Sequence, residues 1–390
     1  MRNATRRAGV AAAAAAAVVL AVGCGSTAPH AHGPAAPTSV PASSLDTSLA
    51  TPAGTWATVV MGGSAASNNN FWQLFIRPAG AAYWHLVTPP GTADNGGLIL
   101  AAGGGEPVVS AFRPSRYLTY TPLTQTRDGG LAWSALNPLD AALASTPDAL
   151  AMKATGGSVL ALLTDGTAEA AAGGSAAWQT IATERTLAAT SAGRRCGLQA
   201  VTAAAYTPSG VPVLAGTCAR PGTVGIFAGI SRGWQPAGPA LPAALASQQI
   251  KTLRLTTTGS QVVALLEAGS GHAASLIAAW SRDNGAHWSL SAPLPLGGAA
   301  MTSASFGAAG TAAVIPASGR AEVITGGGTT WTALPALPAG TATLAPGTGG
   351  EISALAAQRS TLTIWQLLPG HISWTKTQVI SVPIQYGSSG

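Results

Sequence analysis

The stretch Ser281-Arg282-Asp283-Asn284-Gly285-Ala286-His287-Trp288 decides the fold of this chain. A second stretch, Thr126-Arg127-Asp128-Gly129-Gly130-Leu131-Ala132-Trp133, has the same plan. Each begins with a hydroxyl side chain, places an aspartate two residues later and a glycine four residues later, and ends in a tryptophan. Two copies of one phrase indicate that the chain is built from repeats.

The repeat is seen most clearly in the spacing of seven tryptophans. Successive gaps between them are 49, 45, 56, 54, 43 and 43 residues. A period of this length is typical of propeller blades, and each tryptophan is expected to pack against a neighbouring blade. The seven are Trp84, Trp133, Trp178, Trp234, Trp288, Trp331 and Trp374.

Short apolar runs between the tryptophans indicate strands. Each repeat begins with a glycine turn and an apolar strand, such as residues 158–163 or 262–266, followed by a second strand and then the tryptophan strand. Runs of this kind, divided by Gly and Pro, favour an all-β fold. No stretch has a sustained helical period, although residues 141–152 are ambiguous. We predict a seven-bladed β-propeller over residues 51–390, with six or eight blades as alternatives.

The first blade lacks a strand in this interpretation. Residues 54–60, 71–76 and 84–87 would be its second, third and fourth strands. We expect the C-terminal segment Thr377–Ile384 to complete it, because this closes the ring without an open interface. Truncation after about Trp374 is then predicted to destabilise the whole ring.

Residues 1–23 have the features of an export signal. Arg2, Arg6 and Arg7 precede an alanine-rich apolar run that ends at Val22 and is shorter than the about 20 residues that span a membrane. The following Ala21-Val22-Gly23-Cys24 resembles the lipobox of bacterial lipoproteins, in which signal peptidase II cuts before a cysteine that carries diacylglyceride. The resemblance implies that Cys24 is a lipidated N-terminus at the outer face of the cell membrane. An ordinary secretory signal is the alternative, and Arg6-Arg7 leaves twin-arginine export open.

Composition limits the possible partners. Residues 24–50 are mostly Ala, Pro, Ser, Thr and Gly, which predicts a flexible linker. Charged residues make up 8% of the chain, and net charge falls from +6 to +3 without the three arginines of residues 1–23. This weak charge, with no Lys/Arg run, excludes a nucleic-acid-binding protein. Alanine-rich, lysine-poor usage suggests an actinobacterial source.

The cysteines suggest one disulfide. With Cys24 assigned to lipid, Cys196 and Cys218 remain as a pair, 22 residues apart and flanking an apparent hairpin. Disulfides persist outside the cytoplasm, and this one would stabilise the fold by roughly 3 kcal/mol. Two reduced, buried thiols are the alternative.

The two quoted stretches fit the Ser/Thr-x-Asp-x-Gly-x-x-Trp pattern of the Asp-box, or BNR, repeat. A third, from Thr325 to Trp331, keeps the glycine and tryptophan but has Gly326 in the aspartate position. From about residue 51 to its end, the chain therefore resembles the Asp-box β-propellers, a superfamily that includes sialidases and sortilin-type binding proteins.

Residue chemistry favours a structural role for the boxes. Their aspartates can accept hydrogen bonds from their own turn, and their glycines permit backbone angles closed to other residues. In the family the boxes lie in hairpin turns remote from the active site, which implies a structural role here rather than catalysis or Ca²⁺ binding. The residues so assigned are Thr126, Asp128, Gly130, Trp133, Ser281, Asp283, Gly285 and Trp288.

The resemblance also raises the question of catalysis. Family sialidases use three arginines, a tyrosine–glutamate pair and an aspartate, and carry a Phe-Arg-Ile-Pro-like motif. Here Phe75-Ile76-Arg77-Pro78 has another order, and Arg77 falls at a turn position of a decayed box. A basic and aromatic cluster could line a sugar or anion site or form an exposed loop; it comprises Arg113, Arg116, Tyr117 and Tyr120. The carboxylates are scattered, so no catalytic set can be assembled, and no metal or cofactor motif is found.

We therefore predict an exported, membrane-anchored, monomeric lipoprotein that binds protein or glycan at the cell envelope, without catalysis, cofactor or metal. A sialidase-like exo-glycosidase is the first alternative. An assembly factor for another exported protein is the second.

Overall fold

Four-stranded antiparallel sheets make up most of the described chain. The structure is a computed structural model, and it describes residues 47–62, 70–90, 98–103, 107–112, 121–173 and 177–382. The chain divides into two units, residues 1–35 and 36–390, and every described residue belongs to the second. The export signal and the lipidation site predicted at Cys24 lie outside the described residues.

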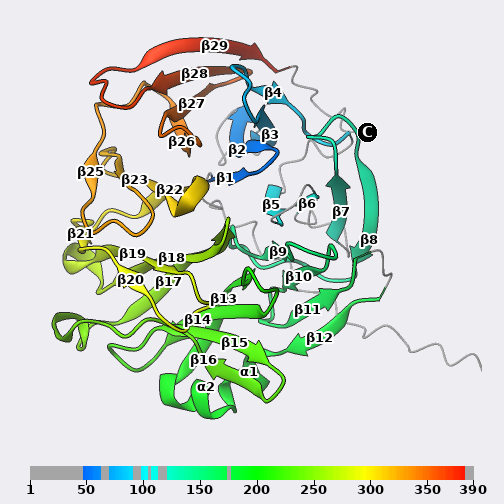
Figure 1. The fold of residues 1–390 in the computed structure, drawn as a ribbon, viewed down its shortest axis with the longest axis vertical. Coiled ribbons are helices and arrows are strands. Elements are labelled where there is room, and N and C mark those ends of the chain that lie inside the picture. The colour runs from blue at the N-terminus through cyan, green and yellow to red at the C-terminus, as the bar shows by residue number, and fades with distance from the viewer. Residues whose placement is uncertain are drawn as a thin grey trace, which may run out of the picture. The chain divides into compact units, whose positions relative to one another are not determined.

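The strands fall into groups of four that are consecutive in the chain, each termed a sheet, although two such groups are joined into one eight-stranded sheet and one group has a fifth strand (Figure 1). Sheet 1 comprises β1 (Thr47–Thr51), β2 (Gly54–Gly62), β3 (Asn70–Pro78) and β4 (His85–Leu86). Sheet 2 comprises β5 (Leu98–Ala102), β6 (Val108–Phe112), β7 (Thr121–Thr126) and β8 (Ser134–Leu139). Sheet 3 comprises β9 (Leu150–Met152), β10 (Val159–Leu162), β11 (Ala168–Ala171) and β12 (Gln179–Ala182). Sheet 4 comprises β13 (Leu198–Tyr206), β14 (Pro212–Cys218), β15 (Gly225–Ile230) and β16 (Gly233–Pro236).

The remaining sheets follow the same plan. Sheet 5 comprises β17 (Ile250–Thr258), β18 (Gln261–Ala268), β19 (Ser275–Ser281) and β20 (Ser289–Leu290), and β21 (Leu294–Pro295) also pairs with β19. Sheet 6 comprises β22 (Met301–Phe306), β23 (Ala312–Pro316), β24 (Glu322–Ile324) and β25 (Thr332–Ala333). Sheet 7 comprises β26 (Thr341–Pro346), β27 (Ile352–Gln358), β28 (Thr361–Leu367) and β29 (Thr375–Ser381). One parallel pair, Leu49↔Phe306, joins sheets 1 and 6.

The sheets succeed one another cyclically. β9 lies beside β5 and β13, β13 lies beside β17, and β26 lies beside β22, β1 and β2. The last sheet therefore packs against the first, which is the arrangement of a β-propeller. The predicted all-β propeller class is confirmed. The number of seven blades stays a prediction.

The alternation of strand direction defines two faces of this ring of sheets. Turns that join first to second strands, and third to fourth strands, lie at one edge; this edge is termed the turn face. Linkers that lead into first strands, and turns that join second to third strands, lie at the opposite edge, termed the linker face.

The predicted completion of the first blade by Thr377–Ile384 is wrong. β29 pairs with β28 as the fourth strand of sheet 7, and β1 supplies the first strand of sheet 1. Composition places residues 47–50 in the predicted linker, yet Leu49 is buried and Ser48 is hydrogen-bonded to two neighbouring sheets. The folded region therefore begins by Thr47 rather than at residue 51.

Buried alanines explain the unusual composition. Small side chains occupy many buried positions in the first and second strands, where they let adjacent sheets approach one another at native packing density. The fully buried alanines in these strands include Ala203, Ala215, Ala264, Ala304, Ala313, Ala345 and Ala354. Much of the chain's diffuse hydrophobicity is thus core rather than surface.

Helices are few and short in the described residues. α1 (Glu184–Ala188) begins with a capping box formed by Thr183 and Thr186. α2 (Ser191–Cys196) ends at Gly197, whose φ of 65° is left-handed. Three 3₁₀ turns also occur: η2 (Ala243–Leu245), η3 (Gly271–Ala273) and η4 (Ala308–Gly310). None of the helices in the described part of the chain has the length and apolarity needed to cross a membrane.

Candidate functional site

The two quoted stretches form turns on the turn face, between the third and fourth strands of sheets 2 and 5. In the first turn, the Thr126 hydroxyl donates to Asp128 Oδ1 at 2.8 Å and accepts from Gly130 N at 2.9 Å. Ala132 N donates to Asp128 Oδ1 at 2.9 Å. The side chains of one turn thus satisfy its own backbone donors.

The second turn repeats this scheme. Ser281 Oγ donates to Asp283 Oδ1 at 2.9 Å and accepts from Gly285 N at 2.8 Å. His287 N donates to Asp283 Oδ1 at 2.8 Å. Gly285 has a φ of 93°, and Gly130 has 88°, so both positions require the left-handed conformation that glycine provides.

The box carboxylates are held in the charged form. The backbone N–H of His287, and next its ring nitrogen 2.6 Å from Asp283 Oδ2, lower the pKa of Asp283 to about 2. The backbone N–H of Ala132, and next the Thr126 hydroxyl, lower the pKa of Asp128. A general acid needs a raised pKa, so these groups suit the role of structural hydrogen-bond acceptors.

Three of the repeated tryptophans bridge adjacent sheets through their indole N–H. Each acceptor is the carbonyl of a residue three or four positions after the preceding tryptophan in the repeat. The bonds run from Trp288 to Ala237 at 2.8 Å, from Trp331 to Ala292 at 3.1 Å and from Trp374 to Pro335 at 3.4 Å. Trp84 is buried, whereas Trp133, Trp178 and Trp234 are partly buried against the core.

The predicted disulfide between Cys196 and Cys218 is present. Cys196 ends α2 and Cys218 ends β14, and both are buried. The bridge fixes the helical segment to sheet 4.

Arg77 does not occupy a turn, in contrast to the prediction. It lies in β3, where its Nη2 is 2.5 Å from Glu351 Oε1 and its guanidinium lies over the Trp84 ring, 5.8 Å from the centroid. Because Glu351 precedes β27, this ion pair joins sheet 1 to sheet 7. The other predicted cluster, Arg113, Arg116, Tyr117 and Tyr120, lies outside the described residues.

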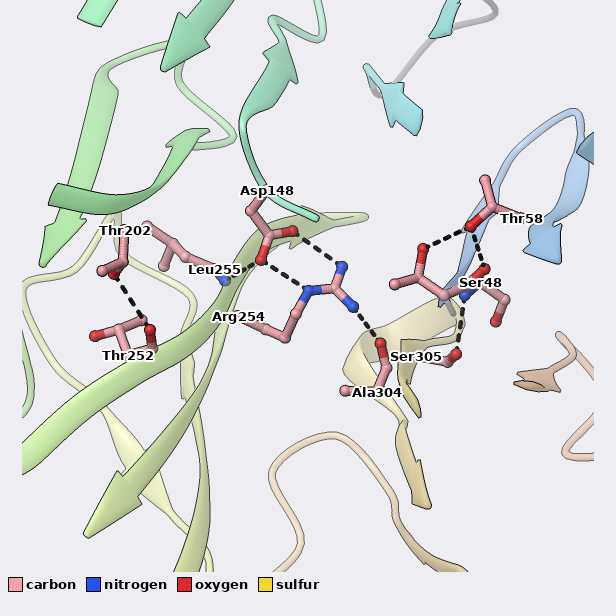
Figure 2. Close-up of polar contacts among 10 residues, drawn as sticks. Ser48, Thr58, Asp148, Thr202, Thr252, Arg254, Leu255, Ala304 and Ser305 are labelled. Carbon is pink, nitrogen blue, oxygen red and sulfur yellow. Dashed lines mark hydrogen bonds and ion pairs between the residues drawn. The ribbon is translucent and has the colours of Figure 1, made fainter. Parts of the chain in front are cut away.

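A buried ion pair joins three sheets where their first strands meet (Figure 2). Arg254 Nε and Nη2 donate to Asp148 Oδ2 and Oδ1 at 2.8 and 2.9 Å, and Leu255 N donates to Asp148 Oδ2 at 2.9 Å. Arg254 Nη1 donates to the carbonyl of Ala304 in β22. The guanidinium also lies 5.1 Å from the centroid of the Phe306 ring. All three nitrogens of the Arg254 guanidinium therefore donate hydrogen bonds to groups of the protein.

A network of hydroxyls joins sheets 1, 6 and 7 beside this pair. Ser48 N donates to Ser305 Oγ, and Ser48 Oγ donates to the carbonyl of Leu344, both at 2.9 Å. Thr343 Oγ1 lies 3.0 Å from Ser303 Oγ and 3.1 Å from Ser305 Oγ. These side chains are buried, and their bonds satisfy polar groups that burial would otherwise penalise.

The space beside the ion pair is small. A cavity of about 20 Å³ is lined by Asp148, Arg254, Thr47 and neighbouring residues, which is room for about one water molecule. This cavity is therefore too small for a ligand larger than water, which would need another site.

The linker face carries such a site. A depression of about 700 Å³ lies over the beginnings of β9, β13, β17 and β22, within the size range of ligand pockets. Its residues come from linkers, from second-to-third-strand turns and from the strand ends beside them. They are Ala144, Ser145, Thr146, Pro147, Thr164, Val201, Thr202, Lys251, Thr252, Leu253, Glu267, Gly271, Ala274, Gly298, Ala299, Ala300 and Met301.

The lining of this depression is nearly neutral. Its charged members, Lys251 and Glu267, stand opposite one another in the β17–β18 register. The other described members are hydroxyl residues, small or aliphatic residues, proline and glycine. A surface of this kind recognises a ligand through hydrogen bonds and apolar contact more than through net charge. The described residues contain no group of three or more His, Cys, Asp or Glu arranged to hold a metal ion.

Sequence reasoning missed this site and the ion pair below it. Asp148 and Arg254 are 106 residues apart, and no motif links them. Lys251, Thr252 and Arg254 lie in a strand that was not recognised. The available signal was the combination of Ile, Leu and several β-branched threonines in Ile250–Thr258, residues that are common in strands.

Comparison with solved structures agrees with the fold. A protein from Lactobacillus plantarum matches with a TM-score of 0.52 and 12% identity, over 84% of this chain and 96% of that one. A candidate 6-phosphogluconolactonase from Bacteroides uniformis matches with a TM-score of 0.50 and 15% identity, over 84% and 96%. YCF48 bound to a D1 peptide matches with a TM-score of 0.43 and 15% identity, over 90% and 98%.

The two matches with TM-scores of 0.50 and above agree with a β-propeller fold, and at such low identity they show nothing finer. No protein-family model and no curated protein sequence matches the chain.

Proposed function

We propose that the protein is an exported lipoprotein, held at the outer face of the cell membrane by lipid on Cys24, whose propeller binds a protein or glycan ligand without transforming it. The depression on the linker face supports this proposal most strongly. It gathers residues of four sheets, most of them from loops, around one concave surface, and binding residues on propellers are carried by loops of a rigid scaffold.

The chemistry of the lining favours binding over hydrolysis. Glycoside hydrolysis uses two placed carboxylates, or a carboxylate with a substitute nucleophile. Among the described residues of the depression, Glu267 is the carboxylate, and Lys251 stands opposite it. This pair suits a neutral hydrogen-bonding surface. Turnover of a fluorogenic sialoside or another glycoside by the full chain, lost on Arg113→Ala, would instead support the sialidase-like alternative.

Site-specific photo-crosslinking tests the binding role. A photoreactive phenylalanine analogue is placed at Ala300, an exposed member of the depression, and in a second strain at Leu131, exposed on the turn face. We expect an envelope protein or glycan to crosslink through Ala300 and not through Leu131. Equal adducts at both positions, or none at Ala300, would refute the assignment of the site.

The anchor is tested separately by metabolic labelling with an alkyne fatty acid. The parent chain should incorporate label and sediment with membranes, because a diacylglyceride anchors stably through two acyl chains. Cys24→Ser should do neither. Labelling that persists in Cys24→Ser would contradict the anchor.

A further inference from the structure

The first strands of sheets 4 to 7 share an irregularity near the linker face. The register with the second strand shifts once in sheets 5 to 7 and twice in sheet 4, and each shift is the mark of a β-bulge. In sheet 4 the extra residues are Gln199 and Thr202 of β13, and in the other sheets they are Leu253 in β17, Thr302 in β22 and Ala342 in β26. Recurrence at one position of successive sheets indicates a designed feature of this face rather than a local defect.

Two cavities coincide with these bulges. Thr202 and Leu253 line the depression, and Thr302 lines a second groove of about 490 Å³ between sheets 6 and 7. The same groove is lined by Ala336, in the linker between β25 and β26, and by Thr341, the first residue of β26. Met301 lines the depression and Thr302 lines the groove, so consecutive residues of β22 contribute to the two cavities.

We propose that the depression and the groove are two parts of one track, which binds an extended, uncharged polypeptide segment across sheets 3 to 7. The proposal rests on the proposed binding function and names the ligand class. A bulge leaves the backbone polar groups of its extra residue outside the strand ladder. An extended polypeptide carries a donor and an acceptor on nearly every residue and is recognised through such main-chain groups.

The side chains of the track agree with this ligand. The groove adds Ile315, Pro316, Leu337 and Pro338 to the small and aliphatic residues of the depression, and its described lining carries no charge. None of the described residues that line either cavity is aromatic, so the large flat apolar surface on which a sugar ring packs is missing from them. Small or aliphatic side chains on a peptide fit this lining.

Peptide binding to the full chain tests the track. The probe is a fluorescein-labelled pool of 12-residue peptides built from Ala, Ser, Thr, Pro, Leu and Gln, followed by its tightest member and the two six-residue halves of that member. Ala300→Arg places a charge in the depression and Ala336→Arg places one in the groove; Leu131→Arg, on the turn face, is the matched control. All three positions are exposed, and unchanged melting temperatures establish that the variants are folded.

We expect each track variant to weaken the 12-residue peptide by about tenfold, the equivalent of about 1.4 kcal/mol, and Leu131→Arg to have no effect. Each half should respond to only one of the two track variants. Loss of affinity with Ala300→Arg but not with Ala336→Arg would overturn the single track while leaving the binding function intact. If neither variant weakens binding of the peptide, both the single track and the binding role proposed for the depression fail. If no peptide binds but neutral oligosaccharides bind in an Ala300-dependent way, the polypeptide assignment alone is overturned.

Discussion

Arg254 shows how one side chain can hold three sheets together. It lies in sheet 5. It donates two hydrogen bonds to the carboxylate of Asp148, in the linker into sheet 3, and one to a carbonyl of sheet 6. The guanidinium and the carboxylate each have an opposite charge and hydrogen-bond partners, and this is the condition under which a buried ion pair is tolerated. Removing one partner leaves the other as an uncompensated buried charge.

This predicts a large stability loss in single variants and a smaller one in the pair. Asp148→Leu should lower the free energy of unfolding by about 3–5 kcal/mol, and Arg254→Met by a similar amount. The double variant should lose less than either single variant, because no charge remains buried. Urea denaturation measures all three, and additive losses would contradict the coupling.

Asp283 provides a prediction on pH. Its pKa is about 2, below the ordinary 3.8, because the folded turn donates hydrogen bonds to its carboxylate. A depressed pKa contributes stability above the unfolded value, and that contribution is lost as pH falls from about 4 through 2. Carboxyl NMR of the parent should show a midpoint near 2.

His287→Ala removes the ring but keeps the backbone N–H that contributes most to the shift. The midpoint should therefore rise only part of the way toward 3.8. A parent midpoint near 3.8 would show that the turn does not hold the carboxylate as described.

At the scale of elements, the sequence predicts the outer strands better than the inner ones. The apolar runs at 158–163 and 262–266 proved to be second strands, β10 and β18, rather than first strands. β22 and β26 contain Ser and Thr whose hydroxyls meet partners from other sheets, such as Ser303 with Thr343. Such residues resemble a loop when their distant partners are unknown, so the sequence does not predict these two first strands.

The same limitation explains the candidate site. The depression is assembled from the ends of inner strands and from linkers, and its members lie up to 157 residues apart, from Ala144 to Met301. By contrast, the box turns form within eight residues, so their local hydrogen bonds follow from sequence alone. The disulfide lies between these cases. Its two cysteines are distant in sequence, but in an exported chain with Cys24 assigned to lipid they are the remaining pair, which is enough to predict the bond.

The disulfide makes the third prediction. Replacing Cys196 and Cys218 together with Ala should lower the free energy of unfolding by roughly 3 kcal/mol, since a loop of 22 residues is no longer closed in the unfolded chain. Thermal unfolding with and without reductant provides the measurement. The double variant should be insensitive to reductant, and a parent that is equally insensitive would contradict the role of the bond.

At the scale of the whole ring, contact between sheets 7 and 1 replaces the strand exchange that the sequence suggested. Gln378 of β29 accepts from Trp84 N and donates to Trp84 O, both at 2.8 Å. Gly62 N donates to Arg359 O at 2.9 Å. A shared apolar cluster that includes Phe75 of sheet 1 and Leu355 of sheet 7 lies beneath these bonds.

Gln378→Leu should therefore lower the melting temperature, because two backbone groups of Trp84 lose their partner. The free energy of unfolding is expected to fall by about 1–3 kcal/mol. Lys376→Ala, an exposed change in the same strand, is the control and should have little effect. Truncation after Trp374 should cost more, since it removes β29 entirely. An unchanged melting temperature in the truncated chain would show that the ring does not depend on this closure.

The way the ring closes has a consequence for the order of the chain. β1 begins and β29 ends on the linker face, in sheets that touch, and each of these two sheets is made from its own four strands. The break between the ends therefore lies between two sheets, as do the linkers that lead from one sheet to the next. A circular permutant that joins Ser381 to Thr47 through a short glycine and serine bridge, and opens between Pro242 and Ala243, keeps every strand pairing intact.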